Sequence, residues 1–207
     1  MKAALASALA ALLLGGCISV GLGGDAAAHR HLVLADATVA DVARRDAPLV
    51  EALLLQPQPA DAMADTLSIA YARAEGSYAF YQHATWTERP VRQLPRLLQQ
   101  RLEKRGIAVA VGSVGDPLRA DWLLAIGVDT VHHDVRTPPG TARLALTVDL
   151  FDRRQRVRVA HRRFMASAPV AQADSAAAAA ALSVAVGATF DALMPWLEAE
   201  LQRAAAR

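Results

Sequence analysis

Apolar and polar residues alternate along the middle of the chain in the pattern of strands. Residues 142–151 alternate between aliphatic side chains and small or polar ones, which is the two-residue period of a half-buried strand. A similar alternation predicts strands over 66–72 and 121–131. Shorter apolar or aromatic runs predict the remaining strands, at 31–35, 53–56, 78–83, 107–111 and 157–166.

One segment between these strands has the longer period of an amphipathic helix. Leucines recur every three or four residues between Pro90 and Gly106, and Thr87 precedes them as a candidate N-cap. The same spacing predicts that the cations of this segment lie on the outer face of the helix: Arg96, Arg101, Lys104 and Arg105.

A second helix is predicted at the end of the chain. An apolar stripe at helical spacing runs from Leu182 to Leu201, and Asp174 or Ser175 is placed to cap its start. Strands, a helix, more strands and a final helix follow one another along the chain. This order predicts an α+β fold with a single mostly antiparallel sheet and two helices packed on one face.

The first residues of the chain have the pattern of a lipoprotein signal peptide. Lys2 is followed by an apolar region of twelve residues, Ala3 to Leu14, that carries no charge and is too short to span a bilayer. They end in Leu14-Gly15-Gly16-Cys17, which resembles the lipobox of bacterial lipoproteins. Cleavage before Cys17 and acylation of its thiol and new amino group would provide several acyl chains, and several chains anchor stably where one does not.

This leader divides the chain into three parts. Residues 1–16 are the predicted signal peptide, 17–29 the acylated cysteine with a small-residue, flexible tether, and 30–203 the folded domain. The residue after the cysteine is Ile18 rather than aspartate. By resemblance to the sorting rule of Gram-negative bacteria, this predicts a lipid-anchored protein on the periplasmic face of the outer membrane.

Charge and cysteine content exclude some classes of function. The chain has 22 basic and 20 acidic residues, a balance that provides no strong field for nucleic acid. One cysteine permits no intramolecular disulfide, and its place at the end of the leader explains it as the lipidation site.

Residues suited to catalysis or metal binding are few. His132, His133 and Asp134 are the best candidates, together with His161, but adjacent strand residues face opposite ways and cannot share a metal there. Solvated loop histidines are the interpretation we favour for this group. The serines lack a nucleophile-elbow motif and no glycine-rich phosphate loop is present, so we predict a protein without catalytic activity, metal or cofactor.

Two clusters could form interaction surfaces. Arginines gather in the predicted hairpin that includes Arg153, Arg154, Arg156 and Arg158, which could bind an acidic partner or anionic lipid headgroups, or could protect an exposed sheet edge from aggregation. Aromatic residues gather between Tyr78 and Trp86. We favour core packing for them, with Trp86 as a structural anchor; the alternative is an aromatic surface for a partner or an acyl chain.

The order of these features resembles a known family. Leu67–Tyr71, the aromatic strand Tyr78–His83, then Trp86 and Pro90 before the leucine helix, are similar to the ABC-type transport auxiliary lipoproteins, the PqiC-like lipoproteins of MCE-type lipid transport systems. The resemblance covers about residues 30–203. It implies a non-catalytic role in moving phospholipid or other hydrophobic molecules between membranes, with an MCE-domain protein as partner.

A second hypothesis stays open at this point. A freestanding outer-membrane lipoprotein with a role in envelope assembly or integrity, such as the assembly of lipopolysaccharide, would carry the same leader. Either protein would contact the membrane through its N-terminal lipid, and phospholipid and a second copy of the chain are further candidate partners.

The lipobox generates a direct prediction. Replacing Cys17 by alanine removes the thiol that is alkylated, so Cys17→Ala should yield an unacylated precursor or a soluble form. Mass spectrometry of the purified wild-type protein checks this, because a free thiol on Cys17 would show that the leader has been misread.

Overall fold

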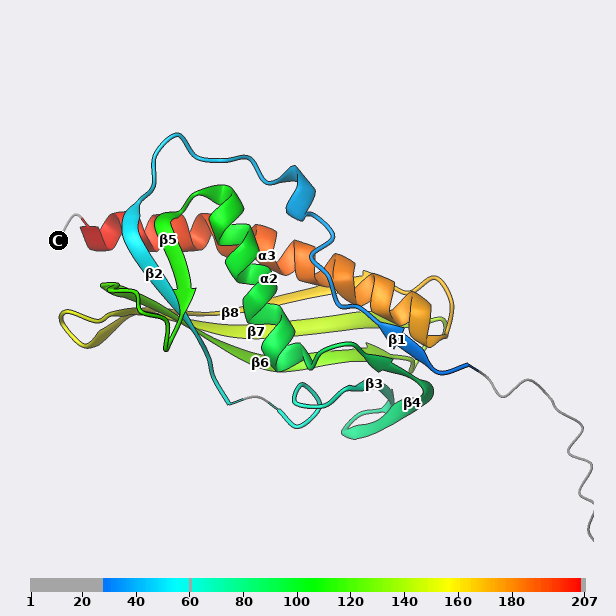
Figure 1. Cartoon of the computed structure of the whole chain (residues 1–207). Helices are drawn as coiled ribbons and strands as arrows, with labels where there is room; N and C mark the ends of the chain where they lie inside the picture. The colour runs from blue at the N-terminus through cyan, green and yellow to red at the C-terminus, as the bar shows by residue number, and fades with distance from the viewer. Residues whose placement is uncertain (1–27, 60, 206–207) are drawn as a thin grey trace, which may run out of the picture.

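A computed structural model describes residues 28–59 and 61–205 of the chain (Figure 1). The predicted leader and Cys17 lie outside these residues. The elements follow in the order β1 (Arg30–Leu32), η1 (Val39–Asp41), β2 (Val50–Pro57), β3 (Ser68–Ala74), β4 (Ser77–Trp86), α2 (Pro90–Arg105), β5 (Ala108–Ser113), β6 (Trp122–Asp134), β7 (Thr141–Asp152), β8 (Val157–Pro169) and α3 (Ser175–Ala205).

The strands form one sheet built around β6. On one side, β6, β7 and β8 pair as long antiparallel ladders. On its other side β6 pairs with two strands, because its thirteen residues make it longer than either of them. Its start pairs in parallel with β2, and its last two residues pair in parallel with β3. Beyond these, β5 pairs in parallel with β2, β4 pairs antiparallel with β3, and β1 pairs in parallel with β4.

This architecture confirms the predicted α+β fold with a mostly antiparallel sheet and two helices. The parallel pairings of β1, β2, β3 and β5 were not predicted. Alternation along a strand shows which face is buried, but it does not show in which direction the neighbouring strand runs.

Both helices cover the same face of the sheet (Figure 1). α2 packs on β5, β2 and β6, and α3 packs on β8, β7 and β6. One continuous apolar core lies between the helices and the sheet. α3 is long and apolar enough to cross a membrane, with a mean hydropathy of 1.6, but most of that stretch is buried against the sheet, so it is a core helix.

The prediction that Arg101 lies on the outer face of α2 is wrong. Its side chain is 1% exposed and its guanidinium forms ion pairs with Asp36, at 3.2 Å, and with Asp191. It also donates hydrogen bonds to Thr38 Oγ1 at 2.8 Å and to the Gly187 carbonyl at 3.1 Å. α3 and the segment after β1 cover this side of α2 with polar groups, and a helical pattern alone does not reveal such a second, polar interface.

The prediction of an outer, solvent-facing row is confirmed for Arg96, whereas Lys104 and Arg105 are half-buried. Arg96 is exposed. Lys104 donates to the backbone carbonyls of Val39 and Ala40, each at 2.6 Å, and Arg105 pairs with Glu198 of α3 at 2.7 Å. The end of α2 is therefore held by hydrogen bonds to two neighbouring segments.

The helix ends follow the sequence in part. Asp174 caps α3, since its carboxylate accepts a hydrogen bond from the Ala177 amide at 2.8 Å. Thr87 does not cap α2: the N-cap position is Arg89, which makes no side-chain cap bond, and Pro90 is the first helical residue. Gly106 ends α2 with φ of +72°, a conformation that favours glycine.

Trp86 lies at the end of β4, is 3% exposed and belongs to the main core. Trp86→Ala should lower the free energy of unfolding by about 3–5 kcal/mol, because the cavity left behind cannot fully collapse. Trp122→Ala is the matched control, since Trp122 is only half-buried and should cost less. Chemical denaturation measures both, and equal losses would contradict a core role for Trp86.

Candidate functional site

The chain enters the fold at one end of the sheet. β1 pairs with the end of β4, with Arg30 opposite Ala84, and the His29 ring nitrogen lies 3.1 Å from Thr85 Oγ1. The β3–β4 hairpin and the start of α3 lie at this same end (Figure 1), which we call the tether end. Because Cys17 precedes His29 by only twelve residues, the tether end is where a lipid on Cys17 would hold the domain.

Aromatic residues of the β3–β4 hairpin gather at the tether end. The ring centroids of Tyr71 and Tyr81 are 5.0 Å apart, and Arg73 lies over the Tyr71 ring at 5.0 Å. Tyr78 and Phe80 are 47% and 40% exposed. The prediction that this cluster packs in the core is therefore wrong for Tyr78 and Phe80: a shift of register between β3 and β4 separates them from the buried Trp86.

Two histidines at the end of β6 contact the tyrosines of the hairpin. His133 donates from Nε2 to the Pro139 carbonyl at 2.9 Å, since a carbonyl can only accept, and its Nδ1 accepts from the Tyr81 hydroxyl at 2.8 Å. His132 faces the other side of the sheet, with its ring 5.1 Å from that of Tyr78 in an edge-to-face contact. The two adjacent histidines thus hold two different tyrosines of the hairpin.

These positions correct the interpretation of His132, His133 and Asp134 as solvated loop residues. All three belong to β6 and are 8%, 0% and 6% exposed. The strand continues this far because it pairs with β3 and β7 on both sides, and because Asp134 accepts hydrogen bonds from Arg136 at 2.7 Å and Arg143 at 2.8 Å.

His161 is far from this group. It lies on β8 opposite Asp149, whereas His132 lies opposite Arg143, six residues or about 20 Å away along β7. In the described ranges 28–59 and 61–205, no three histidine, cysteine or acidic side chains gather closely enough to hold a metal ion.

A groove of about 800 Å³ opens to solvent between the hairpin and the loop after β6. Its lining includes the rings of Tyr71, Phe80 and Tyr81 and the cations Arg73 and Arg136. We call this the aromatic groove. No carboxylate is among the described residues that line it, so its lining combines aromatic and apolar side chains with two cations.

Burial sets the protonation states around the aromatic groove. Desolvation raises the pKa of Tyr81 to about 12, and the nearby charge of Asp174 adds to this, so its hydroxyl stays a donor to His133. Desolvation also lowers the pKa of His132 and of His133, which favours the neutral form of both rings. The hydrogen bonds from Arg136 hold the pKa of Asp134 well below its usual range.

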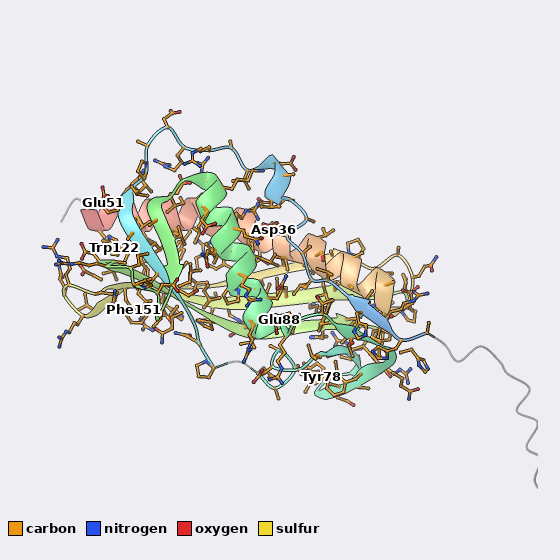
Figure 2. All side chains as sticks on the ribbon, in the orientation of Figure 1. Asp36, Glu51, Tyr78, Glu88, Trp122 and Phe151 are labelled. Atoms are coloured by element: carbon orange, nitrogen blue, oxygen red, sulfur yellow. The ribbon has the colours of Figure 1, made fainter. Side chains whose placement is uncertain are left out.

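The predicted arginine cluster lies at the opposite end of the sheet. Figure 2 labels Phe151 and Trp122 there, far from Tyr78 on the hairpin. The turn 153–156, which we call the arginine loop, joins β7 to β8. Its three arginines, Arg153, Arg154 and Arg156, line a solvent-open hollow of about 510 Å³ together with Arg119.

The three arginines of the arginine loop differ in their hydrogen bonds and ion pairs. Arg153 donates to the Ala120 carbonyl at 2.8 Å, and Arg154 lies 3.9 Å from Asp121 with 76% of its side chain exposed. Arg156 makes no ion pair within the part of the chain that the structure describes. These three side chains are presented to solvent.

Arg158 does not join the other three. It pairs at 3.0 Å with Asp149, a buried carboxylate that also accepts hydrogen bonds from Gln58 and contacts His161 at 2.7 Å. Burial raises the pKa of Asp149, but the hydrogen bonds with His161 and Gln58 lower it by more. The pKa of Asp149 therefore lies below its ordinary value. Arg158 thus neutralises a structural carboxylate.

The sequence had not indicated the groove residues on β3 or after β6. Tyr71 belongs to a segment that carries the family resemblance, but nothing in the sequence marks it as a site residue. Arg73 and Arg136 belong to no motif, and only the fold brings the three residues to the aromatic strand. The signal that was present, a cluster of rings between Tyr78 and Trp86, pointed to the correct segment.

The comparisons with known proteins agree with this architecture. The chain matches the family of the ABC-type transport auxiliary lipoprotein component over residues 33–193. Protein XCC0632 from Xanthomonas campestris has a similar structure, with a TM-score of 0.71 and 22% sequence identity, covering 86% of this chain and 96% of that one. A second crystal structure, of an uncharacterized protein, has a TM-score of 0.62 and 13% identity, covering 82% of this chain and 99% of that one. No curated protein sequence matches the chain.

The two structural likenesses show the fold, and the match over most of the folded domain shows the family. This chain belongs to the ABC-type transport auxiliary lipoprotein component family. It is therefore a lipoprotein of the cell envelope that serves a transport system, as the resemblance had implied.

The buried histidines generate a prediction about pH. The unfolded chain binds protons on His132 and His133 near pH 6.5, where the folded protein, with its lowered pKa values, does not. Their contribution to stability is therefore present above about pH 6.5 and is lost as the pH falls below it. Asp134 and Asp149 also lose stabilising contacts on acidification, but only below about pH 4.

Urea denaturation across this range checks the assignment. The free energy of unfolding should fall between about pH 7.5 and pH 5, and it should fall less steeply in His133→Gln, which cannot take up the proton. The slope is compared rather than the absolute stability, because the substitution also alters the bonds to Tyr81 and Pro139. Parallel curves for the two proteins would contradict a buried, neutral His133.

Proposed function

We propose that this protein is a non-catalytic auxiliary component of an MCE/ABC-type lipid transport system, anchored in the outer membrane through acylated Cys17. The arginine loop, in this proposal, docks on the MCE-domain protein of the system. Family membership supports the transport role. The lipobox and Ile18 support the anchor and its membrane.

The observation that carries the docking proposal is the separation of the tether end from the arginine loop. β7 and β8 run the length of the sheet, and twelve to thirteen strand residues span about 40 Å. A domain held by its N-terminus therefore presents Arg154 and Arg156 on the side away from the anchor, where a partner from the opposite membrane would approach. Exposed cations at this position suit an acidic docking surface.

The polar groups of the interior support a structural rather than a catalytic role. Asp36, Asp134 and Asp149 are each neutralised by an arginine, and His133 is fixed by two hydrogen bonds. Groups engaged in this way hold strands and helices together. The hollows described above are open to solvent rather than enclosed, which suits docking better than carrying a lipid inside the domain.

Charge reversal in the arginine loop tests the proposal. The double variant Arg154→Glu, Arg156→Glu should reduce co-purification of the MCE-domain protein by at least about tenfold, since like charges would then face each other across the interface. The measurement is affinity purification of the tagged, acylated protein from its native envelope, with co-purifying proteins quantified by mass spectrometry.

The matched control is Arg92→Glu, Arg96→Glu, which makes the same change of charge on the exposed face of α2. It should retain the partner. Equal binding by wild type and the loop variant would contradict docking through the loop. Recovery of lipopolysaccharide-assembly proteins in place of any MCE-domain protein would favour the freestanding alternative, and extraction of stoichiometric phospholipid from vesicles by the unpartnered protein would contradict a docking role.

A further inference from the structure

We infer that the aromatic groove is a membrane-facing surface that contacts anionic phospholipids of the leaflet in which the anchor sits. The inference rests on the proposed function in one respect, the acylation of Cys17. It adds a second, reversible contact with the same membrane, made by the folded domain itself. This contact would orient the sheet so that the arginine loop points away from the bilayer.

The first argument is position. The chain joins the domain at His29 and Arg30, directly beside β4, and β4 also carries Phe80 and Tyr81 of the groove. The eleven residues between Cys17 and His29 can bridge at most about 40 Å, so an anchor on Cys17 would keep the tether end within that distance of the bilayer surface. The arginine loop, about 40 Å further along the strands, lies beyond this contact.

The second argument is the kind of side chain exposed. Phe80 is 40% exposed and lines the groove together with the half-buried rings of Tyr71 and Tyr81. Tyr78, at the tip of the same hairpin, is 47% exposed and lines a neighbouring hollow beside His132. Tyrosine has an apolar ring and a polar hydroxyl, a combination enriched where acyl chains meet headgroups. An exposed ring beside an open groove that is lined by further aromatic rings indicates an interaction surface.

The third argument is charge. Arg73 stacks on Tyr71 and makes no ion pair within the described residues, so its charge is available to a ligand. Arg136 binds Asp134 through Nε and Nη2, and its Nη1 makes no hydrogen bond or ion pair among the described residues. No carboxylate lines the groove among the described residues, and Glu75 of the hairpin turn faces a neighbouring hollow. Cations beside exposed rings match the phosphate and the upper acyl chain of a phospholipid.

The groove is open, so it suits a lipid that remains in the bilayer. An enclosed pocket would be required to lift a lipid out of the membrane, whereas an open, cationic and aromatic groove can lie on the headgroup layer. This agrees with a domain that docks between membrane and partner.

Single cysteine probes test the inference on the full, acylated protein. Cys17 is the only cysteine and acylation consumes its thiol, so an introduced cysteine can be labelled alone with an environment-sensitive fluorophore. Ser77→Cys places the probe at the tip of the β3–β4 hairpin, and Gln155→Cys places it at the tip of the arginine loop; both positions are exposed. The labelled proteins are inserted into vesicles of phosphatidylethanolamine with phosphatidylglycerol and purified by flotation.

The Ser77 probe should shift its emission to the blue and be quenched by lipids brominated near the headgroup, whereas the Gln155 probe should do neither. Vesicles of phosphatidylcholine alone should weaken the effect, and Arg73→Glu or Phe80→Ser should reduce the shift by at least half. Both substitutions are at exposed positions, and circular dichroism confirms that the variants are folded.

Three results would overturn the inference. If the floated protein shows equal, aqueous emission at both positions, the groove does not face the membrane, while the anchor and the proposed function stand. The emission of the Ser77 probe could also shift to the blue without being quenched by brominated lipids. If that shift grows with the number of protein molecules per vesicle, a second copy of the chain, and not lipid, covers the groove. If the protein does not float and mass spectrometry finds a free Cys17 thiol, the anchor on which both proposals rest is wrong.

Discussion

The buried guanidinium of Arg101 is the interaction on which the arrangement of the domain depends. It joins α2 to α3 through Asp191 and the Gly187 carbonyl, and to the segment after β1 through Asp36 and Thr38. The three parts approach so closely that a Cβ on Gly187 would lie 2.8 Å from Thr38 Oγ1. Loss of one partner of a buried charge pair costs about 3–5 kcal/mol, because the remaining charge stays desolvated. Figure 2 shows Asp36 beside α2, where this cluster lies.

This cluster matters for function because it fixes the path of the N-terminal segment. β1 contributes only three residues to the sheet and could not hold the chain firmly alone. Arg101 holds Asp36 and Thr38, a few residues after β1, and the pairing of β1 places the entry of the chain beside β4, the strand that also lines the aromatic groove. The long β6–β7–β8 ladder then carries the arginine loop to the opposite end. In the proposed role, one sheet therefore carries two surfaces: the aromatic groove faces the membrane and the arginine loop faces the transport partner.

The sequence predicted the elements that depend on one repeating pattern. The strict alternation over 142–151 and the leucine spacing before Gly106 both correspond to observed elements, and Asp174 caps α3 as its position indicated. Other features depend on contacts between segments that are distant in the sequence, and a repeating pattern cannot predict these. Arg101 is charged, and only the carboxylates of Asp36 and Asp191 explain its burial.

The candidate site shows the same division. The arginine cluster could be located from sequence, but the separation of Arg158 from the loop required the position of Asp149. The buried histidines looked like loop residues because they precede a turn with two prolines, and only the pairing of β6 on both sides shows that the strand continues to Asp134. The aromatic groove combines β3, β4 and the loop after β6, so no single stretch of sequence contains it.

The central claim is that the two ends of the sheet face different neighbours, the membrane at the tether end and the transport partner at the arginine loop. Photocrosslinking in the intact envelope tests it most directly, with benzoylphenylalanine placed at Tyr78 in one strain and at Gln155 in another. The account predicts a crosslink from Gln155 to an MCE-domain protein, and from Tyr78 adducts with phospholipid but none with that protein. A crosslink from Tyr78 to the MCE-domain protein, with none from Gln155, would contradict it.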